Sequence, residues 1–175
     1  MTERGRIQHE LPVADHQEKA IDAFFSAVDD LKQLGVVRSG KYLGDIAEFL
    51  CCNFLKMELA ESKKQEGHDG IIQGLRCQVK FSGGTSTTVD LGNPGAYDRL
   101  IVVLGPDSAL RPTDVSGRWI IYNIPSEVVL RKKPHQDGIR RYTKKQLPQS
   151  YRVGGFSSLS AAELALEANG TPAVQ

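Results

Sequence analysis

Apolar residues recur at helical spacing in two segments near the start of the chain. From His16 to about Leu34 they fall every three or four positions, and Gly35 supplies a stop. A second segment runs from about Lys41 to Glu61, and its apolar stripe consists of Leu43, Ile46, Ala47, Leu50 and Phe54, widened by Cys51 and Leu55. The pattern predicts two amphipathic helices ahead of the first strand.

The spacing changes to strict alternation between Gly67 and Phe81, which predicts a β-hairpin with its turn at Gln73-Gly74. On the second strand one set of side chains is apolar and would pack on a core (Leu75, Cys77, Val79, Phe81), and the other is polar (Arg76, Gln78, Lys80, Ser82). With a two-residue turn, Ile72 faces Leu75 and Asp69 lies opposite Gln78.

The rest of the chain predicts further strands and two more helices. Residues 83–95 are rich in Gly, Ser, Thr and Asn and are typical of a loop. We expect strands at Leu100–Leu104, a continuous apolar run, and at Trp119–Tyr122, a short helix from Pro125-Ser126-Glu127, and a last helix opened by the capping box Ser160/Glu163 and closed by Gly170. This order favours an α/β or α+β architecture with a mixed sheet flanked by helices.

Composition favours one soluble globular domain. With 175 residues, 40% of them hydrophobic, we expect a flexible N-terminal arm at residues 1–15 and a single domain at 16–175. No apolar run reaches the roughly 18 residues that a membrane-spanning helix needs, and the polar segment Met1–Glu10 is unlike a signal peptide. Three cysteines without Cys-x-x-Cys spacing argue against a disulfide framework or a zinc site, which favours a reducing cytoplasm.

The hairpin register brings three functional groups together. Opposed residues of an antiparallel pair share a face with Cβ atoms about 5 Å apart, and Lys80, two residues beyond Gln78, projects to the same side. A carboxylate (Asp69), an amide oxygen and an ammonium there suit a divalent metal ion and a phosphodiester. The alternative is an ordinary amphipathic hairpin whose polar face meets only water.

Glu48 is the second candidate carboxylate. It lies at the edge of the apolar stripe of the second predicted helix, beside Gly44, Cys51 and Leu55, so we expect it to be partly buried where that helix meets the sheet. A lone helical glutamate is usually solvated. Here, however, Gly44-x-x-x-Glu48, Gly67-x-Asp69-Gly70 and Gln78-x-Lys80 follow one another in a short stretch.

In the segments 41–48, 67–71 and 76–80, the chain resembles the PD-(D/E)xK nuclease superfamily. The resemblance is to the variant in which Gln replaces the acid of the third motif, as in restriction enzymes of the Mrr type and in small uncharacterised bacterial proteins, and it covers residues 38–105. It implies a restriction-endonuclease-like core with a mixed sheet of four to five strands.

The resemblance also implies the roles of individual residues. Glu48, Asp69 and Gln78, with the backbone carbonyl of Val79, would hold Mg²⁺ or Mn²⁺, and Lys80 would be catalytic. Hard cations prefer such oxygen ligands, and the metal would supply Lewis acidity and a more acidic water. The chain departs from the pattern at His68, which stands in the place of the superfamily's proline, and at Gln78, which removes one anion and implies a weaker metal site.

A basic segment at residues 131–145 is the candidate DNA-binding surface. It carries Arg131, Lys132, Lys133, Arg140, Arg141, Lys144 and Lys145 against a single acid, Asp137. Such cations track phosphates, although charge runs are usually solvated faces. Tyr142 and Tyr151 are either stacking or core residues. Residues 82–88 could cradle a phosphate but lack the spacing of a P-loop, which argues against a nucleoside triphosphatase.

The leading hypothesis is a cytoplasmic, divalent-metal-dependent endonuclease that cuts DNA, with duplex DNA as the expected partner. The resemblance alone suggests a restriction, defence or mobile-element setting, and a homodimer, since two cuts need two centres. Net charge is only +1, which keeps open a catalytically inactive nucleic-acid-binding or assembly module with the nuclease fold. A purely structural interaction protein is the third alternative.

Overall fold

The computed structural model describes residues 15–60 and 67–156. It divides the chain into two compact units, Met1–Arg38 and Ser39–Gln175, each described by itself. The expected N-terminal arm lies outside the described residues except for its last position, and so does the expected helix from Ser160 to Gly170. None of the described helices is long and apolar enough to cross a membrane.

The first unit contains the helix α1, Asp15–Gln33, close to the predicted bounds. Its apolar stripe is largely exposed: Ile21, Phe24 and Phe25 each expose about half of their surface, whereas Val28 is buried. Gly35 ends the helical segment in a left-handed conformation, as its stop role requires.

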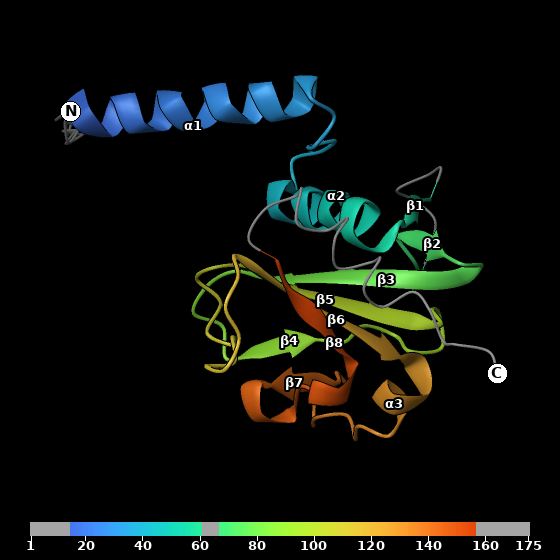
Figure 1. The fold of residues 1–175 in the computed structure, drawn as a ribbon. Coiled ribbons are helices and arrows are strands. Elements are labelled where there is room, and N and C mark those ends of the chain that lie inside the picture. The colour runs from blue at the N-terminus through green and yellow to red at the C-terminus, as the bar shows by residue number, and fades with distance from the viewer. Residues whose placement is uncertain (1–14, 61–66, 157–175) are drawn as a thin grey trace, which may run out of the picture. The chain divides into compact units, whose positions relative to one another are not determined.

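The second unit is an α+β structure around a mixed six-stranded sheet of order β1-β2-β3-β5-β6-β8 (Figure 1). β3 and β5 run parallel, and the other neighbouring strands are antiparallel. The strands are β1 (Glu58–Leu59), β2 (Gly70–Ile72), β3 (Leu75–Ser82), β5 (Arg99–Leu104), β6 (Trp119–Pro125) and β8 (Arg152–Phe156). The short strands β1 and β8 at the two edges take the count above the expected four to five.

Helix α2 spans Tyr42–Leu55 and ends six residues before the predicted position. Lys56 adopts the left-handed conformation, and the N–H of Met57 bonds back to the carbonyl of Cys51, so the chain leaves the helix there. Glu58–Leu59 then pairs with β2. The apolar spacing continues past the end of the helix, because Met57 also packs into the core under α2. This is why the sequence predicted a longer helix.

The predicted hairpin register is confirmed. Ile72 pairs with Leu75, and the turn residues Gln73 and Gly74 have φ of 51° and 80°. Two positive φ values in a row are the mark of a type I′ turn, which matches the twist of the flanking strands. Regular pairing ends at Gly70 and Cys77, where the N–H of Asp69 also donates to the carbonyl of Cys77 at 2.8 Å.

Each face of the sheet has its own core, and β5 contributes to both, as its continuous apolar run predicted. Figure 1 shows α2 over one face and β4, β7 and α3 on the other. The α2-side core consists of Ala47, Leu50, Cys51, Phe54, Met57, Cys77, Val79, Ile101, Val103, Ile121 and Phe156. The β4-side core consists of Val89, Leu91, Tyr97, Leu100, Val102, Leu104, Leu110, Ile120, Tyr122, Ile124, Val129, Tyr142 and Leu147.

The predicted loop at residues 83–95 contains a strand. β4 (Thr88–Asp90) pairs antiparallel with β7 (Arg141–Thr143) in a separate two-stranded sheet. Val89 faces the core while Thr88 and Asp90 do not, an alternation too short to stand out among the Gly and Ser residues before it. Helix α3 (Ser126–Leu130) begins where the sequence predicted.

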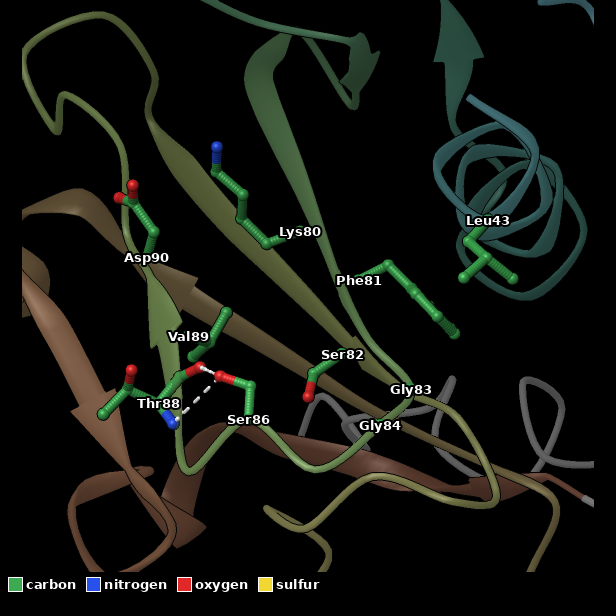
Figure 2. Close-up of a pocket in the computed structure, with 10 residues that line it drawn as sticks. All are labelled: Leu43, Lys80, Phe81, Ser82, Gly83, Gly84, Ser86, Thr88, Val89 and Asp90. Atoms are coloured by element: carbon green, nitrogen blue, oxygen red, sulfur yellow. Dashed lines mark hydrogen bonds between the residues drawn. The ribbon is translucent and has the colours of Figure 1, made fainter. Parts of the chain in front are cut away.

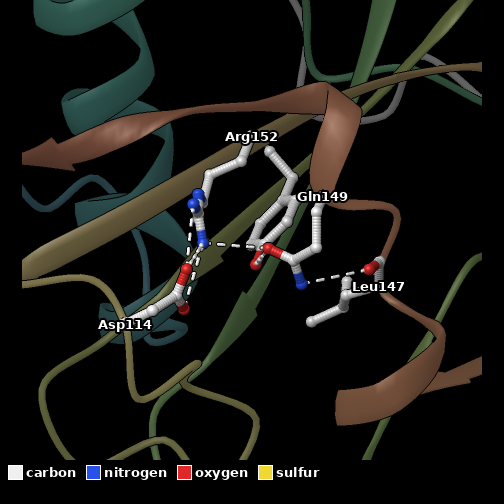
Figure 3. Close-up of polar contacts among 5 residues, drawn as sticks. Asp114, Leu147, Gln149 and Arg152 are labelled. Carbon is white, nitrogen blue, oxygen red and sulfur yellow. Dashed lines mark hydrogen bonds and ion pairs between the residues drawn. The ribbon is translucent and has the colours of Figure 1, made fainter.

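A polar network fixes β8 near the end of the described chain (Figure 3). Arg152 pairs with Asp114 at 3.2 Å and donates to the Oε1 atom of Gln149 at 2.9 Å. Gln149 lies in the 3₁₀ turn Gln149–Tyr151, and the turn Lys144–Gln146 precedes it after β7. The network ties the first residue of β8 to Asp114 and to the turn that precedes the strand.

Candidate metal and nucleic-acid site

Asp69 sits where β2 and β3 separate. Strand pairing between them stops at Gly70 and Cys77, so the N–H of Val79 has no partner on β2. It donates instead to the Oδ2 atom of Asp69 at 2.7 Å. A side-chain carboxylate therefore takes the place of a backbone carbonyl at this point of the sheet.

Gln78 contacts the same carboxylate. Its Nε2 atom donates to Oδ2 of Asp69, and Nε2 also lies 3.5 Å from the carbonyl oxygen of Val79. Because the N–H and C=O of one strand residue point the same way, the Val79 carbonyl faces the edge on which Asp69 lies. The structure thus brings together Asp69, Gln78 and Val79: the side chains of Asp69 and Gln78 are in contact, although regular strand pairing ends one residue earlier, at Gly70 and Cys77.

Glu48 approaches this region from α2, where it is half-buried. Burial raises the pKa of the neighbouring Cys51 thiol well above its usual value, and the charges of Cys52, Cys77, Glu48 and Asp69 raise it further. Cys51 packs in one core cluster with Cys77 and Val79, so α2 lies over this part of β3.

Lys80 follows Val79 on β3. Cys77 and Val79 face the α2-side core, so by strand alternation Lys80 projects toward the other face, as predicted for it and Gln78. A side chain placed at Gly92 would come within 3.8 Å of the Lys80 Nζ atom. In the part of the chain that the structure describes, no hydrogen bond or ion pair joins Lys80 to Asp69.

Lys80 lines a pocket of about 420 Å³ at the end of β3 (Figure 2). Asp90 of β4 lies on the same side of β3 as Lys80, and Phe81 and Leu43 lie on the other. Sequence reasoning did not single out Asp90. The alternation of Thr88, Val89, Asp90 and Leu91 was the available signal, but only the fold shows that β4 runs beside β3.

The donor set fits a hard divalent cation in part. Carboxylate, amide and backbone carbonyl oxygens from Asp69, Gln78 and Val79 are suitable ligands for Mg²⁺, which also keeps several waters. Among the residues that the structure describes, no three His, Cys, Asp or Glu side chains are grouped to hold a metal. A cation here would depend on the amide and carbonyl oxygens, with Glu48 as the other carboxylate nearby.

His68, next to Asp69 in the sequence, acts on another carboxylate. Arg76 forms a two-point contact with Asp98, from Nε at 3.1 Å and Nη2 at 3.0 Å. The hydrogen bonds from Arg76 lower the pKa of Asp98, and the charge of His68 adds to this effect. The Arg76–Asp98 pair ties the start of β3 to the residue before β5.

The basic segment is divided between structural and exposed cations. The Nε of Arg140 donates to the carbonyl of Lys132 at 2.9 Å, and Arg141 pairs with Asp137 at 2.8 Å. The remaining exposed cations are Arg131, Lys133, Lys144 and Lys145. Of the two tyrosines, Tyr142 is buried in the β4-side core and Tyr151 packs against it, so the core interpretation holds for both.

The basic segment adjoins the Lys80 pocket through Asp90. Asp90 of β4 lies opposite Arg141 of β7 in the two-stranded sheet. It also lines a second pocket of about 300 Å³, together with Gly92, Asn93, Gly138, Ile139 and Arg140. Asp90 thus lines both pockets, and the second pocket reaches the basic segment at Arg140.

Comparison with known proteins gives no identification. No protein-family model matches the chain, and no curated protein matches it significantly.

Proposed function

We propose that this chain is a divalent-metal-dependent nuclease of the PD-(D/E)xK type, with a restriction-endonuclease-like core, that hydrolyses phosphodiester bonds in DNA. The observation that carries the proposal is the Asp69 carboxylate beside the Val79 carbonyl where β2 and β3 separate, with the Gln78 amide in contact with both and Lys80 next along the strand. The mixed sheet flanked by helices is consistent with such a core.

The residues would divide the work as follows. Asp69 would hold Mg²⁺ or Mn²⁺, with the Val79 carbonyl and the Gln78 amide oxygen, once the amide turns that oxygen inward, and with Glu48 as a further anion. The bound ion would supply Lewis acidity and a more acidic water. Lys80 would orient the attacking water and offset charge on the phosphate, and its neighbour Gly92 leaves its ammonium accessible from the pocket.

The exposed cations of the basic segment would bind phosphates beside the cleaved bond. Each phosphate contact on duplex DNA contributes a slope of about −0.9 to the dependence of log K on log salt. At most four cations of the segment would make such contacts: Arg131, Lys133, Lys144 and Lys145. Arg140 and Arg141 are already engaged within the protein.

A second candidate function is a non-catalytic DNA-binding or assembly module. Two protein donors, the Gln78 amide and the Val79 N–H, already satisfy one oxygen of Asp69. The Asp69 carboxylate is therefore stable in this position without a cation, as a structural residue would be.

Plasmid cleavage separates the two functions. Purified protein is incubated with supercoiled plasmid and Mg²⁺ or Mn²⁺, beside Asp69→Asn and Lys80→Gln. The nuclease proposal expects nicking or linearisation by the wild type and at least about a hundredfold loss in both variants, as for removal of a group that stabilises the transition state.

The matched control is Asp107→Asn, which removes an exposed carboxylate of the same kind after β5. It should cut like the wild type. Equal cutting by all four proteins would reveal a contaminating nuclease. Binding without cleavage, unchanged by Asp69→Asn, would support the module instead.

A further inference from the structure

We propose that the Lys80 pocket holds one unpaired nucleotide, so that the preferred DNA carries a single-stranded segment beside a duplex. This inference rests on the proposed function for the position of the scissile phosphate, next to Lys80. The pocket itself is argued from its own shape and chemistry.

The floor of the pocket is an open strand edge. Within the described residues, no strand pairs with β3 on the β2 side beyond Cys77. The N–H and C=O of Phe81 face this side, because odd-numbered residues of β3 point toward β2 and even-numbered ones toward β5, as the bonds of Val79 and Ser82 show. A donor and an acceptor are therefore available to the edge of a planar base.

One wall of the pocket is apolar. Leu43 exposes 58% of its surface although it was predicted to lie in the buried stripe of its helix. It lies beside the ring of Phe81 in Figure 2. The Phe81 ring packs closely against the backbone of Gly83, where an added side chain would come within 2.5 Å of it. A fixed apolar wall of this kind suits the face of a base.

The other wall combines one cation with neutral and acidic acceptors. The Oδ1 atom of Asp90 accepts the N–H of Gly92 at 2.8 Å, which holds the carboxylate in place at the pocket. Lys80 and Asp90 together carry no net charge, so the pocket does not favour a run of phosphates. An apolar wall, polar acceptors and zero net charge fit a base with a single adjoining phosphate.

The size of the pocket and its surroundings point to a single nucleotide. A volume of about 420 Å³ lies in the range of roughly 300–1,000 Å³ typical of small-ligand pockets. A base within a duplex cannot present its face to a wall unless it is unstacked. Beyond Asp90 the second pocket leads to Arg140 and the basic segment, where a flanking duplex would lie.

The test measures DNA binding in EDTA, where no metal-dependent cutting occurs. Fluorescence anisotropy compares a blunt duplex with the same duplex bearing a single-stranded overhang. The wild type should bind the overhang substrate about tenfold more tightly, within the range that one base–side-chain contact provides.

Two variants test the pocket, and a third serves as the control. Gly84 has an ordinary backbone conformation and no atom within 4 Å of an added Cβ, so Gly84→Val occupies the pocket without strain. Leu43→Ala removes an exposed side chain and does not depend on tolerance of added volume. Gly154→Val is the matched control, at the opposite edge of the sheet and with its nearest contact at 3.6 Å.

Gly84→Val and Leu43→Ala should each reduce the overhang preference at least about threefold and leave blunt-duplex binding unchanged, whereas Gly154→Val should keep the preference. Equal binding of both DNAs by the wild type, or an unchanged preference in both pocket variants, would overturn the inference. Blunt-duplex cleavage by a protein without the preference would refute the pocket and keep the nuclease. A preference without any metal-dependent cleavage would refute the nuclease and keep the pocket.

Discussion

Asp69 accepts a hydrogen bond from the Val79 N–H, which has no strand partner where β2 and β3 separate, and a second from the side-chain amide of Gln78. A carboxylate in this position has two effects. It satisfies the Val79 N–H, and it collects negative charge beside an amide and a carbonyl oxygen. The structural and the metal-binding interpretations of Asp69 therefore predict different responses to its removal.

We expect Asp69→Ala to destabilise the metal-free protein by about 1–3 kcal/mol, because the Val79 N–H and the Gln78 amide lose their acceptor. Urea denaturation in EDTA measures this. Asp69→Asn, whose amide oxygen can still accept a hydrogen bond, should lose less. An Asp69→Ala midpoint equal to the wild type would show that these bonds contribute nothing to stability.

The thiol of Cys77 should be unreactive in the folded protein. Burial raises its pKa to about 11, and its side chain is fully buried between β3 and α2. Iodoacetamide at pH 8 should therefore modify it only after unfolding, since the thiolate is the reactive form. Mass spectrometry of native and urea-treated samples reports this directly, and rapid labelling of the native protein would contradict the packing described.

Much of the residue-scale site was predictable, and the reason is local. A two-residue turn fixes the register of a hairpin, so the contact between Asp69 and Gln78 followed from counting residues. Asp90 was not predictable, because its place beside Lys80 depends on β4 pairing with β7 about 50 residues away. The distance between Lys80 and Asp69 was not predictable either, because it depends on where the pairing of β2 with β3 ends.

Among the elements, the Gln73-Gly74 turn carries the register of the whole site. Gly74 has φ of 80° and no atom near an added Cβ, so Gly74→Ala tests backbone strain alone. We expect a loss of about 1–2 kcal/mol in unfolding free energy. Gln73→Asn, a residue better suited to a positive φ of 51°, should be neutral or stabilising.

Chemical denaturation of the turn variants provides the measurement, with Gly40→Ala as the control. Gly40 also has open space around it but no positive φ, so its replacement should change stability by less than about 0.5 kcal/mol. Equal effects at Gly40 and Gly74 would mean that the turn is not strained as described.

The connection before β7 has a pH-dependent ion pair. The hydrogen bond from Arg141, and then that from the Ile139 N–H, lower the pKa of Asp137 from 3.8 to about 2. A lowered pKa in the folded state stabilises the protein above the unfolded value and loses this contribution as pH falls through the folded value. The window is therefore about pH 4 to pH 2.

Melting curves of the wild type and Asp137→Asn across that window test the pair. The advantage of the wild type should be constant above pH 4 and shrink toward pH 2. A difference that stays constant or grows on acidification would contradict the assigned ion pair.

Element boundaries followed the sequence wherever one pattern was long enough to dominate. Helix α1 and strand β5 were predictable for this reason. Helix α2 was overextended because Met57 keeps the apolar spacing after Lys56 has turned the backbone away. The strands β1, β4, β7 and β8 are short or peripheral, and tertiary pairing rather than local pattern selects them.

At the scale of the molecule, both hydrophobic cores are built from residues 47–156, all in the second unit. We therefore expect a fragment of residues 39–175 to fold by itself and to keep the sheet. Its circular dichroism and amide NMR spectra should show cooperative unfolding and dispersed signals. A fragment that stays unfolded would show that the first unit is needed for the sheet to form.

The proposed binding and catalytic residues are connected through two strands of the second unit. β3 contributes residues to both the Asp69 cluster and the Lys80 pocket, and β4 joins that pocket to β7 of the basic segment. The proposed chemistry depends on a cation binding beside Asp69.

Paramagnetic broadening of amide NMR signals by Mn²⁺ tests that claim most directly. Titration of the ¹⁵N-labelled protein should broaden first the signals of Asp69, Gln78, Val79 and their neighbours, and Asp69→Asn should abolish this selectivity while the spectrum remains folded. Broadening that is absent at millimolar Mn²⁺, or that begins at exposed acids such as Asp107 and leaves Asp69 and Val79 sharp, would contradict a metal site where β2 and β3 separate.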